Sequence, residues 1–204
     1  MNAVFSTADG LALARRDWPA AGTARGTLLI VHGLGEHAGR YEALAARLAA
    51  QGWNVVSYDQ RGHGASPGAR GAIPDDDALL RDLAAVIDSL RAERPGPLVL
   101  LGHSMGGLVA ARFVAEGLRA PPAPWSRPVD ALVLSSPALA ADTSAAQKLL
   151  LATLGRVAPN LAVNNGLKPE WISRDAAVVA AYVADTLVHD RITPRLARFI
   201  LDGG

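Results

Sequence analysis

The stretch "LGHSMGG" (residues 101–107) decides the fold of this chain of 204 residues. It follows an apolar run, residues 97–101, that is typical of a strand, and residues 105–119 have the apolar spacing of a helix. In the pattern G-x-S-x-G, a sharp turn between strand and helix lifts the serine hydroxyl above the sheet. The small flanking glycines let neighbouring backbones approach the turn. We therefore predict that Ser104 is a nucleophile.

Two backbone N–H groups are candidates to stabilise negative charge beside Ser104. Met105 begins the predicted helix, so its N–H points toward charge developing at the turn. The loop after the predicted strand Thr27–Val31 reads His32-Gly33-Leu34-Gly35, and it offers the Leu34 N–H as a second donor. Loss of one such donor typically costs about 2.7–4 kcal/mol of transition-state stabilisation.

Strand and helix patterns alternate four times along the first 137 residues. Short, almost wholly apolar runs are typical of strands buried on both faces of a parallel sheet. This alternation predicts an α/β fold with a mostly parallel sheet flanked by helices. The predicted elements are a hairpin (4–7 and 11–16, turning at Asp9-Gly10), strand Thr27–Val31, helix 40–51, strand Asn54–Tyr58, helix 75–94, strand 98–101, helix 105–119 and strand Ala131–Ser135.

The pattern changes after Pro137. Residues 138–193 have helical periodicity and no convincing buried strand, so we predict a helical cap that lies over the sheet. Residues 194–204 predict a further helix, with Pro194 in its first turn, that returns to the core. The expected domains are a core (1–137), a cap (138–193) and this returning helix.

Composition excludes several classes of function. Lys and Arg number 20 against 19 Asp and Glu, and no basic stripe is present, so nucleic acid is not an expected partner. Cysteine is absent, and no set of His, Asp or Glu has metal-ligand spacing, so we expect no metal and no cofactor. The start of the chain has no signal-peptide pattern, and the longest apolar stretch is broken by Arg156 and Pro159. We expect a cytoplasmic protein.

Five longer motifs resemble the monoacylglycerol lipase branch of the serine α/β-hydrolases. The resemblance covers nearly the whole chain, including the cap. One departure is Thr186, where this branch usually carries proline. The motifs are "HGLGEHAGRY" (32–41), "YDQRGHGAS" (58–66), "GHSMGG" (102–107), "VLSSPAL" (133–139) and "ISRDAAVVAAYVADTLVHDRIT" (172–193).

The resemblance implies an α/β-hydrolase fold and a role for each matching position. Ser104 would attack a lipid ester, with the N–H groups of Leu34 and Met105 as oxyanion donors. The cap would shape an acyl-chain tunnel and touch a membrane surface transiently. Glu36 and Arg40 correspond to positions near the alcohol end of the substrate; the alternative interpretation is a salt bridge that anchors the loop.

A complete catalytic triad is not visible in the sequence. A serine needs a base to take its proton and an acid to orient that base, and in these hydrolases both follow the nucleophile in the chain. The acid normally follows a strand after the cap, and the histidine follows the last strand. Of the five histidines, only His189 follows Ser104, and it lies at a position where the resemblance implies a non-catalytic residue. The other four are His32, His37, His63 and His103.

Two hypotheses about function follow. The first is a serine ester hydrolase that cleaves monoacylglycerol-type lipids through an acyl-enzyme on Ser104; lysophospholipases, short-chain esterases and acyltransferases are variants of it. The second is a catalytically inactive lipid-binding module, or half of a split enzyme that pairs with a partner chain. The resemblance implies C-terminal strands missing beside Ala131–Ser135. We therefore expect the N-terminal part of a longer hydrolase, with an unpaired sheet edge that favours self-association.

Overall fold

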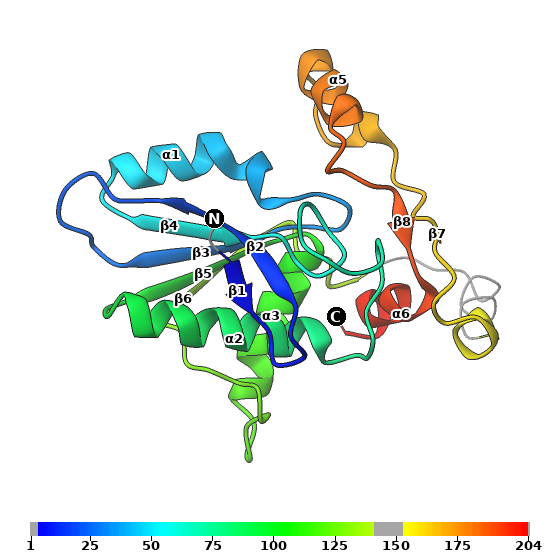
Figure 1. The fold of residues 1–204 in the computed structure, drawn as a ribbon, viewed down its shortest axis with the longest axis horizontal. Helices are drawn as coiled ribbons and strands as arrows, with labels where there is room; N and C mark the ends of the chain where they lie inside the picture. The colour runs from blue at the N-terminus through cyan, green and yellow to red at the C-terminus, as the bar shows by residue number, and fades with distance from the viewer. Residues whose placement is uncertain (1–3, 141–152, 204) are drawn as a thin grey trace.

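The fold is known from a computed structural model that describes residues 4–140 and 153–203 (Figure 1). Six strands form one sheet in the order β1-β2-β4-β3-β5-β6. The last four of these are parallel to one another, as the sequence predicts. The strands are β1 (Val4–Ser6), β2 (Ala12–Trp18), β3 (Thr27–Val31), β4 (Asn54–Tyr58), β5 (Leu98–His103) and β6 (Ala131–Ser135).

The N-terminal hairpin forms where the sequence predicts it. Strands β1 and β2 are antiparallel, and β2 continues the sheet by pairing with β4. Gly10 has φ +84°, a conformation that glycine adopts without steric cost, and its N–H donates to Thr7 O at 3.0 Å. The Thr7 hydroxyl also donates to Asp9 Oδ1 at 2.6 Å. These short-range contacts fix the turn.

Helices cover both faces of the sheet. Helix α1 (Glu42–Ala50), which follows a short 3-10 turn at Ala38–Tyr41, packs on one face, and α2 (Ala78–Glu93) and α3 (Met105–Gly117) pack on the other (Figure 1). Helix α2 begins after the three aspartates of residues 75–77, three residues later than predicted. The two elements that border Ser104 in sequence, β5 and α3, are therefore anchored in packed layers.

Side-chain alternation along β3 divides the core between these faces. Leu29 and Val31 join the larger cluster with α2 and α3, whereas Leu28 and Ile30 join the smaller cluster on the α1 side. The apolar face of α2 is buried in the larger cluster. Burial of each such aliphatic side chain stabilises the fold by roughly 1.5–3 kcal/mol. The buried residues of this face include Leu80, Leu83, Ile87 and Leu90.

The described part of the predicted cap lies between β6 and the last helix. A helical turn at residues 153–157 leads to β7 (Val163–Asn164), which pairs with β8 (Arg191–Ile192); between them lie a 3-10 turn, η2 (Pro169–Trp171), and α5 (Ala176–Ala184). Helix α5 projects away from the sheet (Figure 1). The sequence predicts only helices in this segment, so the two-residue strands β7 and β8 differ from the prediction. Residues 141–152 of the predicted cap lie outside the described residues.

Helix α6 (Pro194–Asp202) packs against the main core. The Thr193 side chain accepts a hydrogen bond from Leu196 N, and Pro194 occupies the first turn. Leu196 and Phe199 are buried in the larger cluster. Among the described residues, no helix combines the length and apolar character that crossing a bilayer requires.

Strand β6 lies at an edge of the sheet. Among the described strands it pairs with β5 alone. Val133 and Leu134 remain 44% and 38% exposed. An apolar edge with free backbone groups is a surface on which another strand can pair.

Helix α3 crosses the end of β3 at very close range, and Gly106 makes this possible. A Cβ atom at Gly106 would overlap the carbonyl oxygens of Val31 and His32. Both are backbone atoms at the end of β3, so a rotamer change cannot relieve the overlap. Glycine at this position therefore follows from packing.

We expect Gly106→Ala to lower the free energy of unfolding by about 1–3 kcal/mol, because the added methyl forces backbone atoms apart. Gly155→Ala is a matched control, since a Cβ there meets only the flexible side chain of Arg198 and lies in a helical turn. Urea unfolding followed by circular dichroism measures both. Equal stability of Gly106→Ala and the unmodified chain would contradict the packing argument.

Candidate active site

Ser104 occupies the sharp turn between β5 and α3. Its φ is 52° and its ψ is −120°, a conformation that costs a non-glycine residue about 1–3 kcal/mol. Three backbone hydrogen bonds hold it: Ser104 N donates to Ser135 O at 3.0 Å, and Ser104 O accepts from Leu108 N and Ala138 N at 3.1 and 3.0 Å. The end of β6 therefore helps to impose the strained turn.

Ser104 lies in the wall of a cavity of about 530 Å³. The sequence-predicted residues Leu34, Glu36 and Arg40 line the same cavity, so the fold brings them together with the serine. Met105 does not line it: its side chain is buried in the main core. As the first residue of α3, Met105 has a backbone N–H without an intrahelical acceptor.

The Glu36 carboxylate is buried and fully engaged. Its Oε1 accepts hydrogen bonds from Gly33 N at 2.6 Å and from the Tyr41 hydroxyl at 2.7 Å, and its Oε2 accepts from Arg40 Nη1 at 2.7 Å. Burial alone raises the pKa of this carboxyl, but the neighbouring basic groups and these hydrogen bonds outweigh burial and hold the pKa below its ordinary value. Glu36 thus ties Gly33, next to Leu34, to residues 40 and 41.

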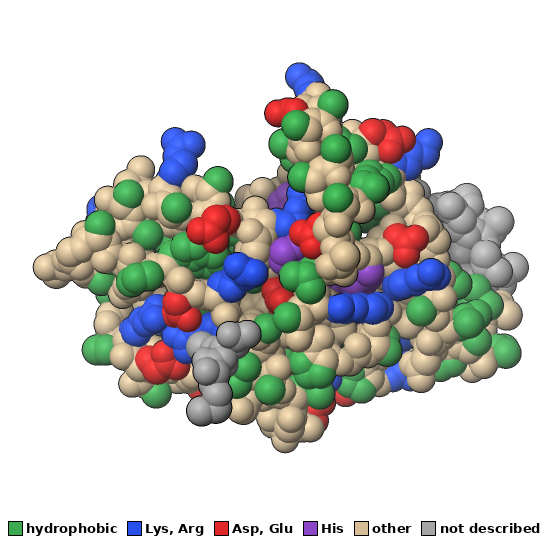
Figure 2. Space-filling view, turned by 45° about the horizontal axis from the view of Figure 1, so that its top comes forward, with side chains coloured by type: hydrophobic (Ala, Val, Ile, Leu, Met, Phe, Trp, Pro, Cys, Tyr) green, Lys and Arg blue, Asp and Glu red, His purple; other side chains and the backbone are tan. Residues whose placement is uncertain are grey.

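Two contacts join this loop to the cap segment around α5. The Arg40 guanidinium stacks on the Tyr182 ring, 4.6 Å from its centroid. His37 Nε2 donates to Asp185 Oδ2 at 2.8 Å. The salt bridge that the sequence offered as an alternative for Glu36 and Arg40 is present, and it forms part of this junction. Histidine and basic side chains gather where the cap meets the core (Figure 2).

All five histidines lie within the described residues, and no hydrogen bond joins any of their rings to the Ser104 hydroxyl. His103 lines the cavity, but its Nδ1 lies 3.0 Å from Ser135 Oγ. His32 accepts from Gln60 N at Nε2, so its Nδ1–H donates to Gly33 O, and burial lowers its pKa. The ring centroids of His63 and His189 lie 4.7 Å apart with the ring planes tilted by 45°, and burial lowers the pKa of His189 to about 4.

Several residues of the cavity are not predicted from the sequence. Tyr41 and Ser136 contribute from the core, and Lys168, Trp171 and Tyr182 contribute from the cap segment. The cap residues are more than sixty positions away from Ser104 in the chain. No spacing or periodicity connects them to the serine, so only the tertiary structure identifies them. Within residues 4–140 and 153–203, no three His, Asp or Glu side chains are grouped as metal ligands.

Proteins similar to this chain include lipases. It is 37% identical over 187 residues to the monoglyceride lipase of Homo sapiens, covering 89% of this chain and 58% of the relative. It is 35% identical over 204 residues to the monoacylglycerol lipase of Mycolicibacterium smegmatis, covering 98% and 70%. The chain therefore spans 58% and 70% of the length of these two relatives.

Solved structures with the same fold include two lipases. The monoacylglycerol lipase of Paleococcus ferrophilus matches with a TM-score of 0.75 and 36% identity, covering 94% of this chain and 69% of that one. A soluble variant of the monoglyceride lipase of Saccharomyces cerevisiae matches with a TM-score of 0.82, covering 99% and 68%; at 22% identity it supports the fold alone.

The family described as "Serine aminopeptidase, S33" matches residues 22–204, which is most of the chain. The six-stranded sheet and the turn at Ser104 agree with that match. The chain belongs to this family of α/β-hydrolases.

Proposed function

We propose that this chain carries the nucleophile and the oxyanion donors of a serine ester hydrolase that acts on monoacylglycerol-type lipids. The observation that carries the proposal is the strained conformation of Ser104 in the wall of a cavity. Its similarity to lipases that cleave monoacylglycerols supports the same substrate class. Leu34 and three apolar residues of the cap segment offer the cavity a wall for an apolar ligand: Leu167, Trp171 and Ile172.

In the proposed reaction, Ser104 Oγ attacks the carbonyl carbon of the ester while its proton passes to a general base. The N–H groups of Leu34 and Met105 stabilise the oxyanion. Collapse of the tetrahedral intermediate breaks the bond to the alcohol, which leaves with a proton from the base. Water then attacks the acyl-serine in the same manner and releases the fatty acid.

The general base is the part of this mechanism for which the described residues offer no hydrogen-bonded candidate. None of the five histidine rings bonds to Ser104. This observation favours a second candidate function, a lipid-binding module or one half of a split enzyme whose partner supplies the base. The two functions differ in whether Ser104 becomes acylated.

Glu36 has a role in the proposal that differs from direct substrate binding. Its oxygens are already occupied by Gly33, Tyr41 and Arg40. We infer that Glu36 is a positioning residue, which holds the loop so that the Leu34 N–H faces the oxyanion. Arg40 remains the member of this pair that can contact the alcohol portion of the ester.

The cap segment also exposes apolar side chains, and we propose that they contact a lipid surface. Val157 and Val183 are 80% and 65% exposed. Transfer of each into lipid would contribute on the order of 1 kcal/mol, which corresponds to about fivefold in affinity.

Ser104 in the isolated chain should depend on added imidazole for its reactivity. In the presence of imidazole, we expect the chain to hydrolyse p-nitrophenyl butyrate at least about tenfold faster than Ser104→Ala does. Imidazole in solution can act as the general base that none of the histidine rings supplies to Ser104. Ser104→Ala also corrects for hydrolysis by imidazole itself. A fluorophosphonate probe should add one label, detected by intact mass and absent in Ser104→Ala. A folded chain without label and without this increase would support the binding module instead.

Replacement of Glu36 should slow acylation without unfolding the chain. We expect Glu36→Ala to lower the rate of fluorophosphonate labelling, measured in the presence of imidazole, about 10²-fold, because a displaced loop removes one oxyanion donor. Glu36→Gln keeps a carbonyl oxygen for Gly33 N–H and should lose less. Glu42→Ala, an exposed position on α1, is the matched control. Equal rates for Glu36→Ala and Glu42→Ala would refute the positioning role.

Binding to phosphatidylcholine vesicles, measured by flotation, tests the lipid contact. Val157→Ser and Val183→Ser should each weaken binding about three- to fivefold. Val4→Ser is the control, since Val4 is 47% exposed but lies on β1, away from the cap. Unchanged binding in both cap variants would remove the proposed contact.

A further inference from the structure

The Ser104 cavity has an excess of positive charge. Its wall carries one carboxylate, that of Glu36, and two cations, Arg40 and Lys168. Glu36 is already neutralised by Arg40 at 2.7 Å and saturated by two further hydrogen bonds. One positive charge in the wall is therefore left without a counter-charge in the cavity.

Lys168 is the cation of the cavity wall that has no counter-charge there. It precedes η2, its side chain is exposed, and its Nζ lies 5.8 Å from the centroid of the Trp171 ring. No carboxylate in the described part of the chain forms an ion pair with it. Asp185 at the cap junction accepts from His37, and Asp190 accepts from Asn164 and pairs with Arg191. Glu170, two residues after Lys168, is exposed and does not line the cavity.

Arg40 has N–H groups that remain available to a ligand. Nη1 is bonded to Glu36, and the guanidinium plane lies against Tyr182. Among the described residues, its other nitrogens make no hydrogen bond, and the side chain remains 26% exposed. A guanidinium held in place by stacking and by one carboxylate is suited to receive an anionic oxygen on its free edge.

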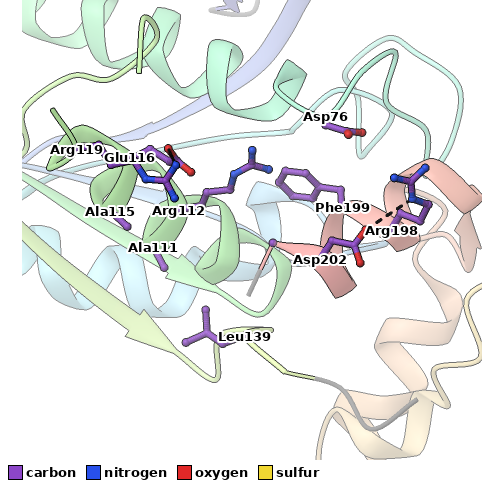
Figure 3. Close-up of a pocket in the computed structure, with 11 residues that line it drawn as sticks. Asp76, Ala111, Arg112, Ala115, Glu116, Arg119, Leu139, Arg198, Phe199 and Asp202 are labelled. Atoms are coloured by element: carbon purple, nitrogen blue, oxygen red, sulfur yellow. Dashed lines mark ion pairs between the residues drawn. The ribbon is translucent and has the colours of Figure 1, made fainter. Parts of the chain in front are cut away.

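A second cavity of about 530 Å³, between α3 and α6, provides a contrast (Figure 3). Three arginines line it, but each is paired with a carboxylate. Its charges are balanced by neighbouring side chains, so it does not require an anionic ligand. The pairs are Arg112 with Asp77 at 3.3 Å, Arg119 with Glu116 at 3.1 Å, and Arg198 with Asp202 at 3.7 Å.

We propose that the Ser104 cavity recognises lipids with a phosphate on the glycerol, through Lys168 and the free edge of Arg40. The ligand class is a single-chain glycerophosphate, in which an apolar chain lies near Leu167 and Trp171 and the phosphate lies near the two cations. This inference deepens the proposed function by naming the alcohol portion of the ester. It concerns binding, so it can be tested apart from ester cleavage.

The test uses ether lipids, which have no ester to hydrolyse. Dissociation constants of 1-O-decylglycerol 3-phosphate and 1-O-decylglycerol are measured by calorimetry below their critical micelle concentrations. We expect the chain to bind the phosphate lipid at least about fivefold more tightly, and we expect this preference to fall with added salt. Equal affinity for the two lipids at low salt would overturn the proposal.

Variants of Lys168 assign the preference to this residue. Lys168→Met should remove most of it, Lys168→Glu should reverse it, and Lys168→Arg should retain it. Arg174→Gln removes an exposed cation that does not line the cavity, and it should leave the preference unchanged. A preference that survives Lys168→Glu, or that is lost equally in Arg174→Gln, would contradict the assignment.

Two further measurements distinguish this inference from a free-phosphate site and from a failure of the proposed catalysis. Inorganic phosphate, titrated alone at matched ionic strength, should bind much more weakly than the phosphate lipid; equal affinity would mean a free-phosphate site and would overturn the lipid assignment. Ser104→Ala should retain the preference, because the ether lipids need no nucleophile. Failure of Ser104 labelling with an intact preference would therefore refute only the proposed catalysis.

Discussion

The conformation of Ser104 is the constraint on which the other features depend. A non-glycine residue at φ 52° costs free energy that only the surrounding structure can offset. Here the end of β6 bonds to both sides of the turn, and Gly106 lets α3 approach the backbone of β3. The position of the hydroxyl is therefore set by the packed sheet and its helices. Such a site is more rigid than one built on an independent loop.

Glu36 connects this rigid turn to the other residues of the cavity. Its carboxylate gathers Gly33, Tyr41 and Arg40, and Arg40 in turn stacks on Tyr182 of α5. A single buried charge thus holds the loop beside Ser104 and also joins core to cap segment. Because buried charges are expensive unless they are paired and hydrogen-bonded, each partner of Glu36 is also part of its stabilisation.

The cavity combines an apolar wall, a serine in a strained turn and one cation without a counter-charge, and these features suit an amphiphilic ester. The five histidines make other contacts: they bond to backbone groups, to Asp185 or to Ser135, and the rings of two of them lie side by side at a tilt. Proton transfer from Ser104 is therefore the step for which this structure offers no hydrogen-bonded partner among its histidines.

The sequence by itself determined the α/β class, the turn at Ser104 and most element bounds, because continuous apolar runs and glycine-bounded turns are local signals. Within the predicted helix at residues 40–51, only the structure decided which side chains are buried: Leu44 is 41% exposed, whereas Ala45 is buried because a small residue lets the helix lie close to the sheet. The ribbon of β7 and β8 is too short to have a period. Only the tertiary structure brought Lys168 and Tyr182 to Ser104, because contacts between distant segments depend on packing, which local patterns do not encode.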